Sequence, residues 1–166
     1  MKKYIEMKSV LKFLLLFLLV LPFQACSDDE NTFFEEKPLP VTTNNISGVW
    51  KLQSWNGSEE QVPVVYIELI RRDCKFNLYQ WFSMYPSLKT GVYSLDNSDY
   101  YKGDVIKGKY AYDSGSWNSD YIVTLYTNKL VLISDDENRE VQEFVRVDEV
   151  PADIKNAALS PVSAEE

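Results

Sequence analysis

Few side chains in this sequence are suited to covalent or acid–base chemistry. The chain of 166 residues has two cysteines, Cys26 and Cys74, 25 aspartates and glutamates, and no histidine. Histidine is the commonest general base and the commonest metal ligand in proteins. Its absence excludes serine–histidine and cysteine–histidine catalysis and histidine-based zinc sites. The chemistry that remains is that of thiols and carboxylates.

The carboxylates show no catalytic or metal-binding pattern. The run from Asp135 to Asn138 offers oxygen ligands, but it lacks the glycine and the spaced acids of a calcium loop, which favours a solvated hairpin turn. A glycosidase needs only two acids, but nothing in the sequence singles out a pair. The acids considered mostly stand in turn contexts, where aspartate is expected to bond to the backbone. The acids considered are Glu68, Asp73, Asp96, Asp99, Asp104, Asp113 and Asp120. We therefore expect neither an enzyme nor a metal or other cofactor.

Cys26 lies where the character of the chain changes. Residues 1–25 carry four lysines and one glutamate around the apolar run FLLLFLLVLPF, from Phe13 to Phe23. A basic start, a short apolar run and a small residue before the break are the marks of a secretory signal peptide. The run has eleven residues, whereas a spanning helix needs roughly 20, so a permanent transmembrane helix is the weaker alternative.

The residues around this break resemble the lipobox of bacterial lipoproteins, with Phe23, Gln24, Ala25 and Cys26 in its four places. The resemblance implies that the Cys26 thiol receives a diacylglycerol, that a peptidase cuts before Cys26, and that the new amino terminus is acylated, for example with palmitate. Several acyl chains anchor strongly, since each buried methylene adds about 0.8 kcal/mol. We therefore expect residues 1–25 to be a lipoprotein signal peptide.

The next residues, Ser27, Asp28, Asp29 and Glu30, resemble the acidic export tag of surface-exposed lipoproteins of the Bacteroidetes. The resemblance implies an outer-membrane protein at the cell surface rather than on the periplasmic face. A solvated acidic linker is the alternative. Removal of residues 1–25 would leave 141 residues and, because four lysines and one glutamate go, would change the net charge from −8 to −11. Such acidity argues against the binding of nucleic acid and against electrostatic docking on anionic lipid.

The rest of the chain divides into a tether, a domain and a tail. Residues 26–45 are polar and acidic with two prolines, which predicts a flexible tether. Residues 46–151 are short runs of β-branched and aromatic residues separated by turn residues, as in a sandwich or barrel of antiparallel strands. In residues 152–166 the stretch after Pro151 predicts a short helix, since proline suits a first turn, and a loose end follows.

Eight strands are predicted in the domain. Within them apolar and polar residues alternate, so that Phe76, Leu78 and Gln80 share one face of a strand and Asn77, Tyr79 and Trp81 share the other. Short strands joined in sequence by tight turns predict an all-β fold, a small eight-stranded antiparallel up-and-down barrel. The predicted strands are 49–55, 64–71, 75–82, 91–95, 105–112, 121–126, 129–134 and 141–147.

The domain also resembles the lipocalins. Gly48-Val49-Trp50 looks like their Gly-x-Trp signature, and Arg146 falls where the family places an arginine over that tryptophan. Guanidinium over indole is a favourable cation–π pair. Later phrases resemble the lipocalin-like domains of Bacteroidetes lipoproteins: GVYSLD at residues 91–96, GKY at 108–110, GSW at 115–117, YIV at 121–123, and VR and VP at 145–146 and 150–151. The resemblance implies a lipocalin-like, monomeric barrel with a small hydrophobic ligand.

Aromatic residues at strand ends and in loops are the candidates for lining a ligand site, because aromatic side chains with a polar handle suit lipids, aromatic compounds or sugars. They are Trp55, Trp81, Tyr93, Tyr110, Trp117 and Tyr121. The alternative is that these side chains fill the barrel, which would then be a structural module or a module that contacts protein or glycan in the outer membrane. Trp50 and Leu52 are predicted to be core. If Cys26 is lipidated, Cys74 is left as a free, buried thiol.

Overall fold

The computed structural model describes residues 36–82, 84–97 and 103–159 of the chain. The signal peptide, Cys26, the export tag from Ser27 to Glu30 and the end of the tail therefore lie outside the described residues. Among the residues that are described, no helix is both long enough and apolar enough to cross a membrane.

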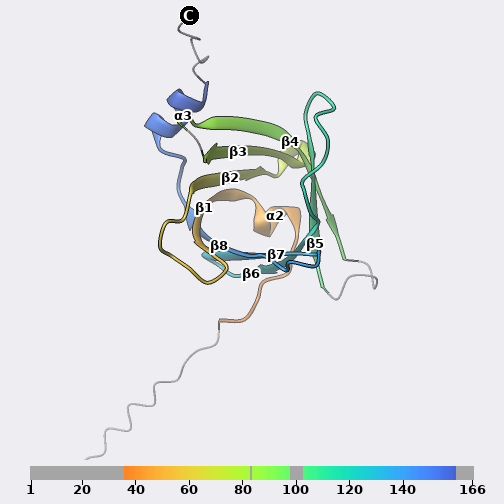
Figure 1. Ribbon diagram of the computed structural model, residues 1–166. Coiled ribbons are helices and arrows are strands. Elements are labelled where there is room, and N and C mark those ends of the chain that lie inside the picture. The colour runs from red at the N-terminus through yellow and green to blue at the C-terminus, as the bar shows by residue number, and fades with distance from the viewer. Residues whose placement is uncertain (1–35, 83, 98–102, 160–166) are drawn as a thin grey trace, which may run out of the picture. The chain divides into compact units, whose positions relative to one another are not determined.

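Eight strands form a closed antiparallel barrel in which each strand pairs with the next and β1 pairs with β8 (Figure 1). The predicted fold class is confirmed. The strands are β1 Gly48–Trp55, β2 Val64–Ile70, β3 Lys75–Trp81, β4 Ser87–Asp96, β5 Val105–Tyr110, β6 Tyr121–Leu125, β7 Lys129–Ser134 and β8 Val141–Val147. A 3-10 turn, η1 Arg72–Cys74, links β2 to β3.

Period-two alternation builds the core. On β3, Phe76 and Leu78 are buried toward the barrel interior, and Trp81 at the end of the strand is 40% exposed. On β1, Trp50, Leu52 and Ser54 are buried while Lys51 and Gln53 between them are exposed. Each strand thus sends alternate side chains into one shared interior, as a closed sheet requires.

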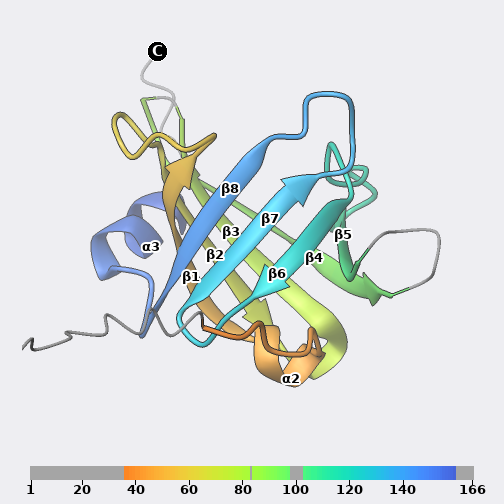
Figure 2. The same cartoon turned by 90° about the horizontal axis from the view of Figure 1, so that it is seen from below.

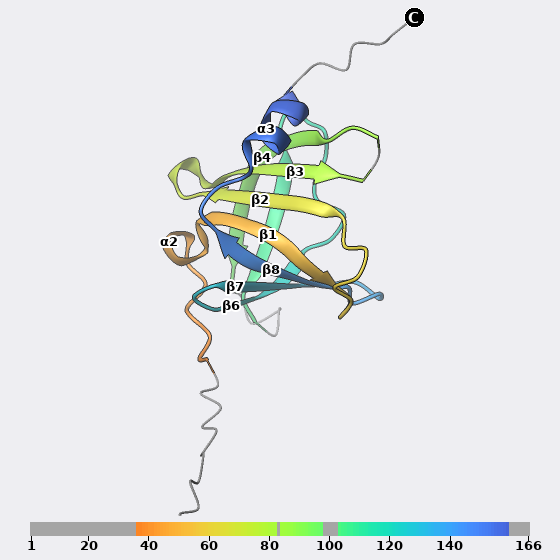
Figure 3. The same ribbon diagram turned by 90° about the vertical axis from the view of Figure 1, so that its left-hand side faces the viewer.

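The up-and-down order places the connections at two ends of the barrel. Figure 3 shows the short helix α2, Thr43–Ile46, beside the turn from β2 to β3, while the β1–β2 and β3–β4 connections lie at the opposite end. We call the end at α2 the closed end. The four connections at the other end, residues 56–63, 82–86, 111–120 and 135–140, are the mouth loops.

The segment before β1 differs from the prediction. Residues 36–45, expected to belong to a flexible tether, are attached to the barrel: Leu39 pairs with Leu125 of β6, and the Thr127 N–H donates to the Glu36 carboxylate at 3.0 Å. Helix α2 follows, capped by the Thr42 side chain. The polar composition of this segment does not predict its attachment to the barrel, because the stabilising contacts come from residues distant in the sequence.

The predicted C-terminal helix is present as α3, Ala152–Leu159. It packs on the outer face of the barrel, where Val150 and Ile154 form a small core with Tyr66 and Tyr79. Figure 2 shows α3 outside the strands, on the side of β1, β2 and β3. Burial raises the pKa of Tyr66 and of Tyr79. This helix therefore covers the barrel wall and leaves both ends free.

Candidate functional site

Trp50 plugs the closed end of the barrel. Its side chain is fully buried, and its indole Nε1–H donates to the Ile46 carbonyl of α2 at 2.8 Å. Ile46 is also fully buried. The bond joins the first strand to the helix that covers this end, so the plug and its cover are held together.

Arg146 braces the plug from β8. Its guanidinium lies 4.1 Å from the centre of the Trp50 ring, and Trp50 and Arg146 are direct partners in the β1–β8 register. The same group donates to the carbonyls of Asn45 and Ser47, each at 2.8 Å, and of Thr127 at 3.0 Å. Gly48 leaves room for it, because a Cβ there would lie 2.4 Å from an Arg146 nitrogen. One side chain thus ties together β1, α2 and the β6–β7 turn.

A cavity of about 570 Å³ occupies the barrel at the mouth end. Its volume falls in the range of small-molecule sites, roughly 300–1,000 Å³. The deeper wall is apolar, with Leu52, Val65, Ile67, Leu78, Leu132 and Phe144. The rim is polar, with Gln80, Lys89, Asn118, Ser119, Asp136, Asn138, Glu140 and Gln142. An apolar body with a polar end would match this division.

Trp117 enters the cavity wall because the β5–β6 connection folds back on β5. The Trp117 N–H donates to the Gly108 carbonyl at 2.9 Å, and the Tyr110 N–H to the Gly115 carbonyl at 2.8 Å. The indole then lies on Gly108, where an added Cβ would be 2.0 Å from the ring. Glycine at this position is therefore what admits the indole to the barrel.

The aromatic rings make edge-to-face contacts along this wall. Trp117 lies 5.1 Å from Phe76 and 6.0 Å from Tyr121 between ring centres. Phe76 in turn lies 5.8 Å from Tyr110. Such pairs stabilise beyond their buried area and hold the rings in defined orientations. The Trp117 Nε1–H is buried and finds no acceptor among the described residues.

No protein-family model and no curated protein matches this chain.

Four of the six aromatic residues predicted to line a ligand site lie in the cavity wall, namely Trp55, Tyr110, Trp117 and Tyr121. The other two do not. Trp81 lies on the face of β3 opposite to Leu78 and Gln80 and is 40% exposed. Tyr93 is buried in the core cluster against which Cys74 packs. Phe82 also lines the cavity, with its ring 6.4 Å from that of Trp55.

Cys74 is half-buried and has no disulfide partner within the described part of the chain. Among those same residues, no three cysteine, aspartate or glutamate side chains are grouped so that they could hold a metal ion. The polar chemistry of the site therefore consists of amides, hydroxyls, one lysine and two carboxylates at the rim.

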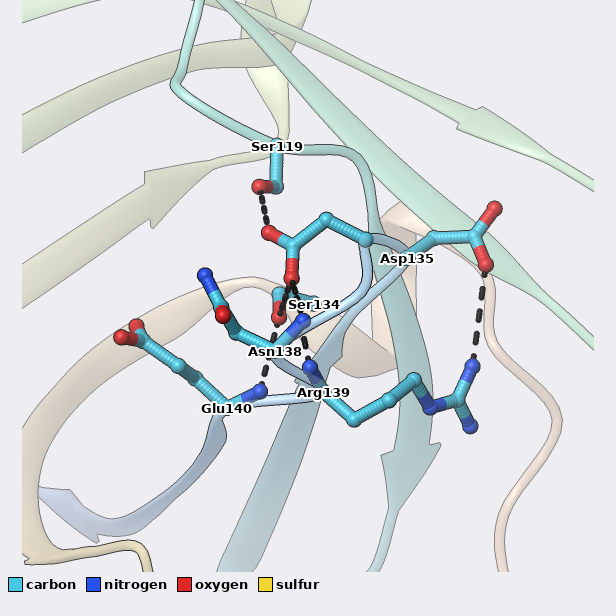
Figure 4. A network of polar contacts seen from close by, with 7 residues as sticks. Ser119, Ser134, Asp135, Asn138, Arg139 and Glu140 are labelled. Atoms are coloured by element: carbon cyan, nitrogen blue, oxygen red, sulfur yellow. Dashed lines mark hydrogen bonds and ion pairs between the residues drawn. The ribbon is translucent and has the colours of Figure 1, made fainter.

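A network of polar contacts organises the β7–β8 mouth loop (Figure 4), and the Asp136 carboxylate is its common acceptor. This carboxylate accepts hydrogen bonds from the hydroxyls of Ser119 and Ser134 and from the backbone N–H groups of Asn138 and Arg139. Ser119 belongs to the β5–β6 loop, so the network joins two mouth loops. The Ser119 hydroxyl, followed by the other three donors, holds the pKa of Asp136 below its ordinary value. The run from Asp135 to Asn138, predicted to be a hairpin turn, thus supports the rim of the cavity.

We expect Asp136→Asn to destabilise the protein near neutral pH and to lose this effect in acid. A carboxyl whose pKa is lower in the folded state contributes stability above its unfolded pKa, near 4, and that contribution disappears as the pH falls through the lower folded value. Thermal melts from neutral pH to strong acid would measure this. The matched control is Asp135→Asn, which removes a single exposed ion pair to Arg139. Equal effects of both substitutions would contradict the prediction.

Tyr121 reports the electrostatic character of the rim. Its pKa is raised, chiefly by burial and then by the negative charges of Glu140 and Asp136, with Tyr110 nearby contributing as well. Burial also raises the pKa of Tyr110. The cavity wall therefore combines neutral phenols with a negative potential from the mouth loops.

Proposed function

We propose that this protein is a lipid-anchored lipoprotein of the outer membrane whose lipocalin-like barrel binds a small hydrophobic or aromatic ligand. The observation that carries the proposal is the cavity of about 570 Å³, apolar in its depth and polar at its rim. Such concave, mostly apolar sites with a few polar groups are typical of small-molecule binding. The unpartnered Trp117 Nε1–H supplies one donor that an acceptor on a bound molecule would satisfy.

The arrangement of the two ends supports this function. Trp50 and Arg146 close one end with direct contacts, so the cavity has a floor. The chain enters the barrel at that closed end, where Leu39 pairs with Leu125. A filled barrel that serves only as an interaction module is the less favoured alternative, because the interior of this barrel is not filled.

Titration of the purified protein with N-butyl dansylamide, a neutral fluorescent probe, tests the binding proposal. Trp55 and Trp117 line the cavity, so bound probe should accept energy from them and fluoresce when tryptophan is excited. We expect saturable binding of one probe per chain. Absence of saturable binding would argue against a ligand-binding barrel and in favour of the interaction module.

The anchor is proposed to be attached at Cys26, with the acidic residues from Ser27 to Glu30 directing the protein to the cell surface. We expect Cys26→Ala to abolish both labelling by a fatty-acid analogue and recovery in the membrane fraction, because both proposed acylation sites, the thiol and the amino terminus exposed by cleavage, belong to Cys26. Cys74→Ala is the matched control and should retain both properties. Labelling of the Cys26→Ala protein at the level of the unmodified protein would contradict the proposal.

A further inference from the structure

Charge is concentrated at the mouth of the barrel. The mouth loops carry eight carboxylates and one arginine, a net charge of −7. On the adjoining strands, Lys89, Lys107 and Lys109 of β4 and β5 oppose this charge, while Asp96 of β4 and Glu143 of β8 add to it. At the closed end, the connections 71–74 and 126–128 and the described part of 97–104 carry two arginines and two aspartates, a net charge of zero. A small molecule that approaches the cavity therefore crosses a negative field, which low-dielectric walls focus into the opening.

Two carboxylates, Asp136 and Glu140, line the cavity itself, and they differ in the hydrogen bonds that they accept from the protein. The Asp136 carboxylate is held by four donors of the protein. The Glu140 carboxylate, in contrast, receives no hydrogen bond or ion pair from any described residue, although the Glu140 N–H donates to Ser134 Oγ at 2.8 Å. Figure 4 shows the Glu140 side chain pointing away from the Asp136 network. Glu140 is therefore a charge at the rim that is available to a ligand.

The wall next to this charge is aromatic. The negative charge of Glu140 contributes to the raised pKa of Tyr121, so its field acts on the cavity wall. Tyr121 and Trp117 make contact in that wall, with ring centres 6.0 Å apart. An organic cation is attracted by the faces of such rings and by a carboxylate beside them. The combination matches an ammonium group better than it matches an anion.

Lys89 is the competing charge, because it lines the same cavity from β4. Its ammonium lies 5.3 Å from the centre of the Tyr110 ring. An anionic ligand group could pair with Lys89, but this single positive charge is smaller than the net negative charge of the mouth loops. The position of Lys89 also shows that an aromatic ring of this wall accommodates an ammonium group. The balance of charge therefore favours a cationic ligand.

We propose that the cavity takes a small molecule with an apolar or aromatic body and a positively charged amine, whose body lies in the barrel and whose amine lies at the mouth beside Glu140. This inference rests on the proposed ligand-binding function and specifies the chemical class of the ligand. The approach of the ligand is steered by the acidic mouth loops, so its association is faster at low ionic strength than at high ionic strength.

Three dansyl probes with one body and different ends test the inference. Dansylcadaverine ends in an ammonium, N-butyl dansylamide is neutral, and dansyl-aminohexanoic acid ends in a carboxylate. At low ionic strength we expect the ammonium probe to bind about tenfold more tightly than the carboxylate probe, and we expect the ratio to shrink in high salt as screening increases. Tighter binding of the carboxylate probe would overturn the inference.

Glu140→Gln is the decisive variant, because it removes the charge while keeping the backbone bond to Ser134. We expect it to weaken the binding of the ammonium probe about three- to fivefold and to leave the binding of the neutral probe unchanged. Glu137→Gln, on the same loop but outside the cavity lining, should change the binding of each probe less than twofold. Lys89→Gln should strengthen the binding of the ammonium probe, because it removes the competing positive charge. If Glu140→Gln has no effect on any probe, the inference fails.

The two proposals fail in different ways. If all three probes bind equally well and binding is lost when the cavity is filled by substitution, the barrel binds ligands but does not select cations, and only the further inference is overturned. If no probe binds saturably, the ligand-binding function itself is overturned, and the inference falls with it.

Discussion

Replacing Trp50 by alanine is expected to lower the free energy of unfolding by about 3–5 kcal/mol, the range for a fully buried aromatic side chain. The substitution removes the bond from Nε1 to the Ile46 carbonyl and the stacking of Arg146 on the indole. It also leaves a cavity beneath α2, where the guanidinium loses its apolar partner. Several elements meet at this one side chain, so collapse of the site is restricted and the loss should be large.

Chemical denaturation followed by circular dichroism would measure the effect, since this signal does not depend on the tryptophan that is removed. Trp81→Ala is the matched control, because Trp81 is 40% exposed on the outer face. We expect it to change stability by less than about 1 kcal/mol. Similar losses in the two variants would show that the closed end is not the anchor of the fold.

Replacing Val65 by tryptophan is expected to weaken the binding of N-butyl dansylamide at least about tenfold, equivalent to about 1.4 kcal/mol. Val65 is 5% exposed and lines the cavity, so a larger side chain there occupies the space proposed for the ligand. Fluorescence anisotropy of the probe would measure the change. Because added volume in a packed interior can cost about 1–3 kcal/mol of stability, a melting curve should accompany each titration.

The neighbouring residue provides the control. Val64 is the same residue type on the same strand, but it lies on the opposite face of β2 and is 38% exposed. Val64→Trp should bind the probe within about twofold of the unmodified protein, since the outer face of the sheet is not part of the site. If a folded Val65→Trp protein binds as tightly as the Val64→Trp protein, the probe does not occupy the barrel.

The strands were predictable from sequence because alternation and turn residues are local signals. The predicted and observed bounds of 129–134 and 141–147 agree in full, and the other strands differ mostly by one or two residues. The exception is β4, which begins at Ser87 rather than Gly91, because Leu88 is the single apolar residue in Ser87–Thr90 and one residue shows no alternation. Helix α2 was missed for a related reason: it has four residues, and its Asn45 and Ile46 carbonyls accept hydrogen bonds from the side chains of Arg146 and Trp50.

The site was only partly predictable. The alternation on β3 already places Trp81 opposite to the cavity-lining Leu78 and Gln80. Trp81 could therefore have been ruled out as a cavity-lining residue on the sequence alone. The place of Trp117 depends on its contact with Gly108, nine residues earlier, which no local pattern reveals. The rim likewise arises when Ser119 and Asp136 meet across two loops. Such contacts are products of the closed barrel and become visible only in three dimensions.

The most direct test of a ligand site inside the barrel is the nuclear magnetic resonance spectrum of the four tryptophan indole N–H groups during titration with N-butyl dansylamide. Trp55 and Trp117 line the cavity, Trp50 lies in the plug, and Trp81 lies on the outer face. With the signals assigned by single Trp→Phe substitutions, we predict that those of Trp55 and Trp117 shift and saturate together while those of Trp50 and Trp81 stay in place. Saturable binding that shifts the Trp81 signal and leaves Trp55 and Trp117 unchanged would contradict a binding site inside the barrel.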